Sequence, residues 1–152
     1  MKKRIALFFL ICMAFSGLEA QEEAENPSLY AVGRVGVTSL YFGYIGMGAV
    51  ADGYSSGVYS LETARSLAAD VENLSASVIK ALENILSKED VSEEDRESIR
   101  EMITIYNLLI GEARGLRSYV EGNSSEDFQS YREKVWNRLS SLFKDRNNDV
   151  MP

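Results

Sequence analysis

The longest regular pattern in the chain is a row of small and apolar residues that recurs in alternating steps of three and four. This spacing places side chains on one face of a helix, and no member of the row carries a charge. Because glycine lets another backbone approach closely, we expect the first half of the row to lie at the centre of the fold. The row consists of Gly36, Ser39, Gly43, Gly46, Val50, Gly53, Gly57, Ser60, Ala64, Leu67, Val71, Leu74, Val78, Ala81 and Ile85.

Residues 28–52 hold the glycine-rich half of this row, and no charge lies between Arg34 and Asp52. A buried helix explains the pattern, although each interior glycine costs up to about 1 kcal/mol relative to alanine. A hairpin is the alternative, because residues 40–45 have strand-like composition and Asp52 with Gly53 forms a turn dipeptide. A membrane span normally needs about 20 apolar residues, and this stretch is shorter and diluted by glycine. We therefore predict a buried helix.

Three further amphipathic segments follow, over residues 60–87, 92–121 and 125–146. Each opens on a serine followed by acidic residues, which is typical of a capped helix start. Residues 53–57 are the weakest helical stretch, so a turn or sharp kink is expected there.

Short links between helices favour antiparallel neighbours, and the pattern as a whole predicts an all-α fold, an up-and-down four-helix bundle. The alternative is a three-helix bundle with a glycine-rich hairpin or irregular N-terminal segment. In either case we expect one helical domain over residues 28–146 and a frayed tail over residues 147–152.

The N-terminal sequence predicts a cleavable signal peptide over residues 1–20, because three basic residues precede an apolar run. Residues 21–27 are acidic and are expected to form a mobile tail. The protein is thus expected to be exported, to the periplasm in a Gram-negative cell. Lipid attachment at Cys12 is less favoured, because the bulky Leu10 and Ile11 precede that cysteine. A membrane-anchored form is likewise less favoured.

The acidic charge of the chain limits the classes of partner that it could bind. Removal of residues 1–20 leaves a formal net charge of −9, with 22 acidic residues against 13 basic ones. Nucleic acids and anionic membranes require clustered Lys and Arg, so a nucleic-acid partner is not expected and membrane contact is not favoured.

The residues needed for most catalytic and metal sites are missing. The chain has no histidine, and its single cysteine lies in the predicted signal peptide. Zinc sites, di-iron sites and Cys-His or Ser-His-Asp nucleophile systems therefore lack a necessary part. The acidic run over residues 89–95 lacks the spacing of a calcium loop and is interpreted as a helix cap. The dinucleotide-like sequence over residues 46–51 lacks its strand-to-helix context. No metal, no cofactor and no enzymatic activity are expected.

Four arginines could form a basic strip on the last two helices. Acidic residues nearby, namely Glu112, Glu121 and Glu133, predict interhelical ion pairs instead, each contributing little stability. Trp136 follows an inward-facing valine and is interpreted either as a contact residue or as a filler at the edge of the core. The arginines are Arg114, Arg117, Arg132 and Arg138.

Small residues beside aromatic ones mark the first helix as the candidate site. Our leading hypothesis is a protein that acts through protein–protein contacts, as a subunit of an envelope complex or as a homo-oligomer, because this segment has more apolar surface than one neighbour can cover. A second hypothesis is a bundle that binds a small apolar or amphipathic ligand beside Tyr41 and Tyr44. The candidate ligand- or partner-binding residues are Gly36, Tyr41, Gly43, Tyr44, Gly46, Gly53 and Gly57.

Overall fold

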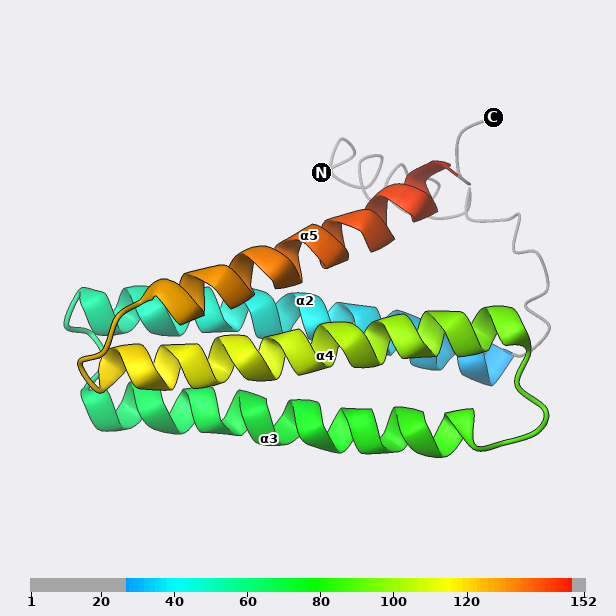
Figure 1. The fold of residues 1–152 in the computed structure, drawn as a ribbon, viewed down its shortest axis with the longest axis horizontal. Helices are drawn as coiled ribbons and strands as arrows, with labels where there is room; N and C mark the ends of the chain where they lie inside the picture. Colours follow the sequence, from blue (N-terminus) through cyan, green and yellow to red (C-terminus); the bar gives the residue numbers. More distant parts are fainter. Residues whose placement is uncertain (1–26, 149–152) are drawn as a thin grey trace, which may run out of the picture. The chain divides into compact units, whose positions relative to one another are not determined.

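The structure is a computed structural model that describes residues 27–148 of the chain, which hold four α helices and no strand (Figure 1). The contacts of the chain divide it into two units, residues 1–31 and residues 32–152, and every contact described below lies within the second unit. The predicted signal peptide and most of the predicted acidic tail lie outside the described residues. The helices are α2 (Pro27–Ser55), α3 (Leu61–Leu86), α4 (Glu93–Val120) and α5 (Glu126–Asn148).

Helix α2 is continuous, so the alternative of a glycine-rich hairpin is wrong. Pro27 is its first residue, a position where the missing amide hydrogen is not needed. The helix runs through Gly53 and ends at Ser55, and the turn that follows contains Gly57 at φ +74°. The amides of Val58 and Tyr59 donate hydrogen bonds back to the Gly53 carbonyl, at 2.8 and 3.0 Å. The expected break over residues 53–57 is therefore a turn that begins after Ser55.

Serine residues cap the next two helices, as the sequence predicts. The Ser60 hydroxyl accepts a hydrogen bond from the Thr63 amide, and the Ser92 hydroxyl accepts one from the Asp95 amide, each at 3.1 Å. Acidic residues fill the first turn of α4, where the helix dipole stabilises negative charge. Capping therefore fixes where α3 and α4 begin.

Helix α4 packs against both α3 and α5 (Figure 1). Ion pairs show that α3 and α4 are antiparallel: Arg65 lies 3.4 Å from Glu121, and Glu72, further along α3, lies 2.7 Å from Arg114, which comes earlier in α4. The Arg138 guanidinium of α5 lies 2.7 Å from Glu101 of α4. Interhelical ion pairs are thus confirmed for Arg114 and Arg138, but their partners are Glu72 and Glu101 rather than the acidic residues named from the sequence.

Two tyrosine hydroxyls tie α2 to α4 and give the direction of the pair. Tyr106 donates to the Gly36 carbonyl and Tyr54 donates to the Val120 carbonyl, each at 3.0 Å. The N-terminal parts of α2 and α4 therefore lie together, as do their C-terminal parts, so the two helices are parallel. This arrangement is consistent with a four-helix bundle.

The centre of the core is α4 rather than α2. Helix α4 contributes eight almost fully buried residues, namely Ile99, Met102, Ile105, Tyr106, Leu109, Ala113, Leu116 and Val120. In the glycine-rich half of the row, Gly36 and Val50 are buried, three glycines are half-buried, and Ser39 and Gly57 are exposed. The expectation that this half lies at the centre therefore holds only in part, because one side of α2 is not covered by the described residues.

Candidate functional site

The inner side of α2 consists of Gly36, Gly43 and Gly48, the glycines that lie against α4 and α5. A Cβ atom on Gly36 would lie 2.9 Å from Met102 Sδ, and one on Gly43 would lie 2.7 Å from Leu109 Cδ2. A Cβ atom on Gly48 would collide with the guanidinium of Arg132. At each of these positions a larger residue would force the end of a neighbouring side chain to move, so glycine fits the present packing of this side.

Gly53 and Gly57 have a separate explanation at the end of α2. The Tyr59 ring lies against Gly53 and leaves no room for a side chain. Gly57 adopts φ +74°, a left-handed conformation that other residues rarely adopt. The turn between α2 and α3 accounts for both glycines without any partner.

Arg132 of α5 connects three helices on the inner side. Its Nη1 donates to the Tyr44 carbonyl of α2 at 2.9 Å and to Glu112 Oε1 of α4 at 2.7 Å. Its guanidinium carbon lies 4.0 Å from the centroid of the Tyr44 ring, a cation–π distance. The Tyr44 ring also stacks with Trp136, at 5.6 Å between centroids. These contacts fix the position of α5 against α2.

Glu112 is the only ionisable side chain among the described residues that is fully buried, at 0% exposure. Its Oε1 is paired with Arg132, whereas its Oε2 has no hydrogen-bond partner in residues 27–148. Burial raises the pKa of Glu112 to about 7, and the neighbouring Arg132 opposes this rise only in part. The carboxyl group is therefore held in a setting where its charge is costly.

Sequence reasoning names Glu112 as an ion-pair partner but misses its burial. A signal was present, because Glu112 follows Leu109 by three residues and precedes Leu116 by four. That spacing places it on the apolar face of α4. A carboxylate on the apolar face of a helix is either buried with a partner or lies at the edge of that face. Glu112 is buried, and its partner Arg132 comes from another helix.

The outer row is the exposed stripe of α2 and consists of Val35, Thr38, Phe42, Ile45 and Ala49. Val35 is 66% exposed, Phe42 67% and Ile45 43%. The steps of three and four keep the five residues on one face, and none of them is charged. The row is thus an uncharged apolar face on a helix whose other side is packed.

Two further predicted residues adjoin the outer row. A Cβ atom on Gly46 would have no other atom within 4 Å, so nothing in the described structure requires glycine there. Tyr41 is 37% exposed, and its ring lies 6.3 Å from that of Phe42. The seven predicted site residues therefore do not form one site: Gly36, Gly43 and Tyr44 lie inside, Tyr41 and Gly46 lie beside the outer row, and Gly53 and Gly57 form the turn.

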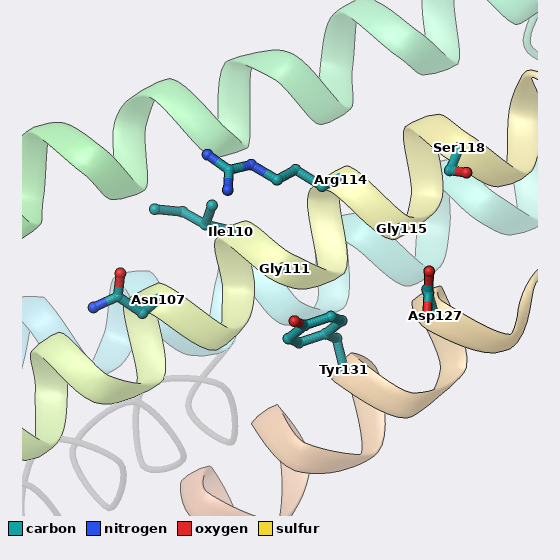
Figure 2. Close-up of a pocket in the computed structure, with 8 residues that line it drawn as sticks. All are labelled: Asn107, Ile110, Gly111, Arg114, Gly115, Ser118, Asp127 and Tyr131. Carbon is teal, nitrogen blue, oxygen red and sulfur yellow. The ribbon is translucent and has the colours of Figure 1, made fainter.

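Several cavities in the described residues lie away from the outer row. One of about 310 Å³ lies between α4 and α5, and Figure 2 shows the Tyr131 ring beside Gly111 at its edge. Another of about 390 Å³ lies beside Arg132 and is bordered by Asp52 and Gln129. Neither Tyr41 nor Tyr44 lines these two cavities or two others at the surface of residues 27–148. The ligand-binding hypothesis therefore gains no support from these cavities.

Two more findings concern metals and membranes. In the part of the chain that the structure describes, no group of three or more acidic, histidine or cysteine side chains could hold a metal ion. Over residues 27–148, no helix combines the length and the apolar character that a membrane crossing requires. The outer row is one of the exposed apolar features of the described residues; Leu61, Leu67 and Leu74 of α3 are exposed as well.

Comparisons of the chain with protein-family models, with curated proteins and with solved structures give no match. The candidate site is therefore judged on its own geometry. That geometry offers the ion pair of the buried Glu112 with the part-exposed Arg132 on the inner side of α2, and one exposed apolar row on the outer side.

Proposed function

We propose that the protein is a non-enzymatic helical protein that acts through protein–protein contacts, and that the outer row of α2 makes them. The observation that carries this proposal is the exposure of Val35 and Phe42, at 66 and 67%, on a face without charge. Large apolar side chains grouped on an exposed face are typical of interaction surfaces. An aromatic anchor such as Phe42 is a common centre of binding energy.

The proposal includes the setting in which these contacts are made. The basic and then apolar N-terminal sequence supports export through a cleavable signal peptide, to the periplasm in a Gram-negative cell. The parallel arrangement of α2 and α4 supports an up-and-down four-helix bundle as the scaffold. On this scaffold the outer row is presented by a helix whose inner side is held rigidly.

Site-specific crosslinking tests the proposal. A photo-crosslinking phenylalanine analogue replaces Phe42 in the chain as cells produce it, and a matched variant carries the analogue at Glu83, an exposed position on α3. We expect an efficient crosslink from position 42 and a weak one from position 83, because only the first position lies in the outer row. Mass spectrometry then identifies the crosslinked chain.

A second variant shows whether the crosslink reports binding. Ile45→Ser in the chain that carries the analogue at position 42 should reduce the yield several-fold, since Ile45 is the neighbouring apolar contact. Equal yields from positions 42 and 83, unaffected by Ile45→Ser, would show that the outer row makes no specific contact.

A further inference from the structure

We infer that the outer row pairs with the outer row of a second copy of this chain, as two antiparallel α2 helices related by a two-fold axis near residue 43. This inference rests on the proposed function and names the partner. In such a contact the same surface serves both copies, so every pairing occurs twice. The charges at the two ends of the row and the residues at its centre both fit this arrangement.

The charges at the ends of the row set the direction of the pair. Arg34 and Asp52 bracket the uncharged stretch and are 18 residues apart, which is five helical turns and about 27 Å. Both therefore lie at the same edge of the outer row. Both are exposed, and neither forms an ion pair with any described residue.

Antiparallel pairing satisfies these two charges, and parallel pairing does not. Rotation about an axis near residue 43 brings Arg34 of one copy beside Asp52 of the other at both ends of the contact. A parallel two-fold pair would instead place the Arg34 and Asp52 of one copy on the edge opposite to those of the other copy. In that arrangement both charges would stay unpaired, so only the antiparallel form gains from them.

The centre of the row fits the same axis. With Arg34 opposite Asp52, the reversed numbering brings Phe42 of one copy close to Ile45 of the other. Gly46 lies next to Ile45 and has open space where a side chain would be, so a partner helix could approach closely there. The protruding Phe42 and the space at Gly46 are therefore complementary within one sequence.

Charge disfavours the other occupants of this surface. An anionic membrane attracts helices that carry several basic residues beside their apolar face. The stretch from residue 34 to residue 52 has one basic residue, and the chain has a net charge of −7.

Because the outer row covers only about four turns of one helix, the contact is smaller than the standard interface of about 800 Å² per partner. We therefore expect a reversible dimer rather than a permanent one.

Charge reversal tests the inference by sedimentation equilibrium on the full chain. The variants are Arg34→Asp, Asp52→Arg and the double reversal, with Lys80→Asp on α3 as the matched control. Each single reversal should weaken dimerisation about tenfold or more, because two like-charge contacts arise per dimer. The double reversal should return to within about threefold of the original chain, and the control should not change. A double reversal weaker than either single one would overturn the inference.

Cysteine crosslinking tests the register independently. In a Cys12→Ser background, Thr38→Cys and Ala49→Cys are made in separate chains, which are then mixed under mild oxidation. The antiparallel register places position 38 of one copy beside position 49 of the other, so the mixed sample should form the linked dimer. A linked dimer from Thr38→Cys alone would indicate parallel pairing and contradict the inference.

The remaining outcomes separate the inference from the proposed function. A chain that stays monomeric, while the analogue at position 42 crosslinks to another protein, overturns the inference and leaves the proposed function standing. Flotation with phosphatidylethanolamine–phosphatidylglycerol vesicles that Phe42→Ser abolishes assigns the row to a membrane and overturns both. A crosslink within one chain, to residues 1–26, also overturns both, since the row would then be covered internally.

Discussion

The two sides of α2 contain the same residue type for opposite reasons. On the inner side, a Cβ atom on Gly36 or Gly43 would displace the side-chain ends of Met102 and Leu109 of α4. On the outer side, Gly46 touches nothing within reach of a Cβ atom. A glycine in a helix lowers stability by about 1 kcal/mol, and only the inner side offsets this cost by close packing. A glycine in a helix therefore does not by itself mark a packed surface.

The two sides also differ in the charged groups that they contain. The inner side encloses a charged pair, with Arg132 held between Glu112 and the Tyr44 carbonyl. The outer row excludes charge altogether and exposes apolar side chains instead. Substitutions on the inner side should therefore change the free energy of unfolding, and substitutions on the outer side should change association.

The largest effect is expected from Arg132→Met, which leaves Glu112 buried without its cation. Breaking a buried ion pair by removing one partner typically costs about 3–5 kcal/mol, and we expect a loss of this size at pH 8. The loss should be smaller at pH 5, where Glu112 accepts a proton. Urea denaturation at the two pH values measures the difference.

The matched control for this prediction is Arg138→Met, because Arg138 pairs with Glu101 at the surface. Exposed ion pairs contribute about 0–1 kcal/mol, so this variant should lose little at either pH. Equal losses for the two variants would show that the burial of Glu112 has no energetic consequence.

A pH dependence of the same origin is expected in the unsubstituted chain. The pKa of Glu112 is raised from 4.5 to about 7 by burial, so the folded state holds its proton more tightly than the unfolded state. The stability contributed by this difference is fully present below pH 4.5 and is lost as the pH rises through about 7. The rise in pKa corresponds to about 3 kcal/mol.

Glu112→Gln isolates this contribution because glutamine keeps an oxygen that can accept from Arg132 but does not titrate. We expect the variant to show little change in the free energy of unfolding between pH 5 and pH 8. The chain has no histidine, so no other side chain has its ordinary pKa in this range. The hydrogen bond from Arg114 lowers the pKa of Glu72, and that effect is lost only as the pH falls below 4.5. A slope that persists in Glu112→Gln would contradict the assignment.

A smaller effect is expected from leucine at the two kinds of glycine position. Gly43→Leu forces a side chain against Leu109 and should lower the free energy of unfolding by about 1–3 kcal/mol. Gly46→Leu meets open space and should raise it by up to about 1 kcal/mol, through helix propensity. Thermal unfolding followed by circular dichroism compares them directly. If both variants lose stability equally, the outer side is packed in the folded chain.

The smallest change in stability is expected from Ile45→Ser in the outer row. Because Ile45 is 43% exposed, the variant should stay within about 0.5 kcal/mol of the original chain. Leu40→Ser is the matched control on the same helix, since Leu40 is fully buried, and it should lose several kcal/mol. Chemical denaturation below the concentration at which dimers form keeps association out of the comparison.

Helix positions could be predicted from the sequence because they depend on local features. Ser92 with its acidic neighbours predicts the start of α4, and the apolar spacing predicts its buried face. The glycine-rich row predicts that α2 is a helix with a small face. Capping residues and apolar spacing therefore predict where most of the helices lie in the sequence.

The side of α2 that is covered could not be predicted, because it depends on distant residues. Gly43 and Gly46 belong to the same row, and only the placement of Leu109 and the lack of any neighbour at Gly46 distinguish them. The burial of Glu112 likewise depends on Arg132, which is 20 residues away on another helix. Sequence spacing gives the face of a helix but not the identity of its neighbour.

The most direct test of the roles assigned to the two sides of α2 is the molecular mass of the chain against concentration, measured by light scattering for the original chain and for Phe42→Ser. We predict that the mass of the original chain rises from that of one chain toward that of two. We predict that Phe42→Ser keeps the mass of one chain at every concentration and unfolds at the same temperature when dilute. An identical rise in both chains, or a lower unfolding temperature for dilute Phe42→Ser, would contradict the separation of a stabilising inner side from a contact-making outer row.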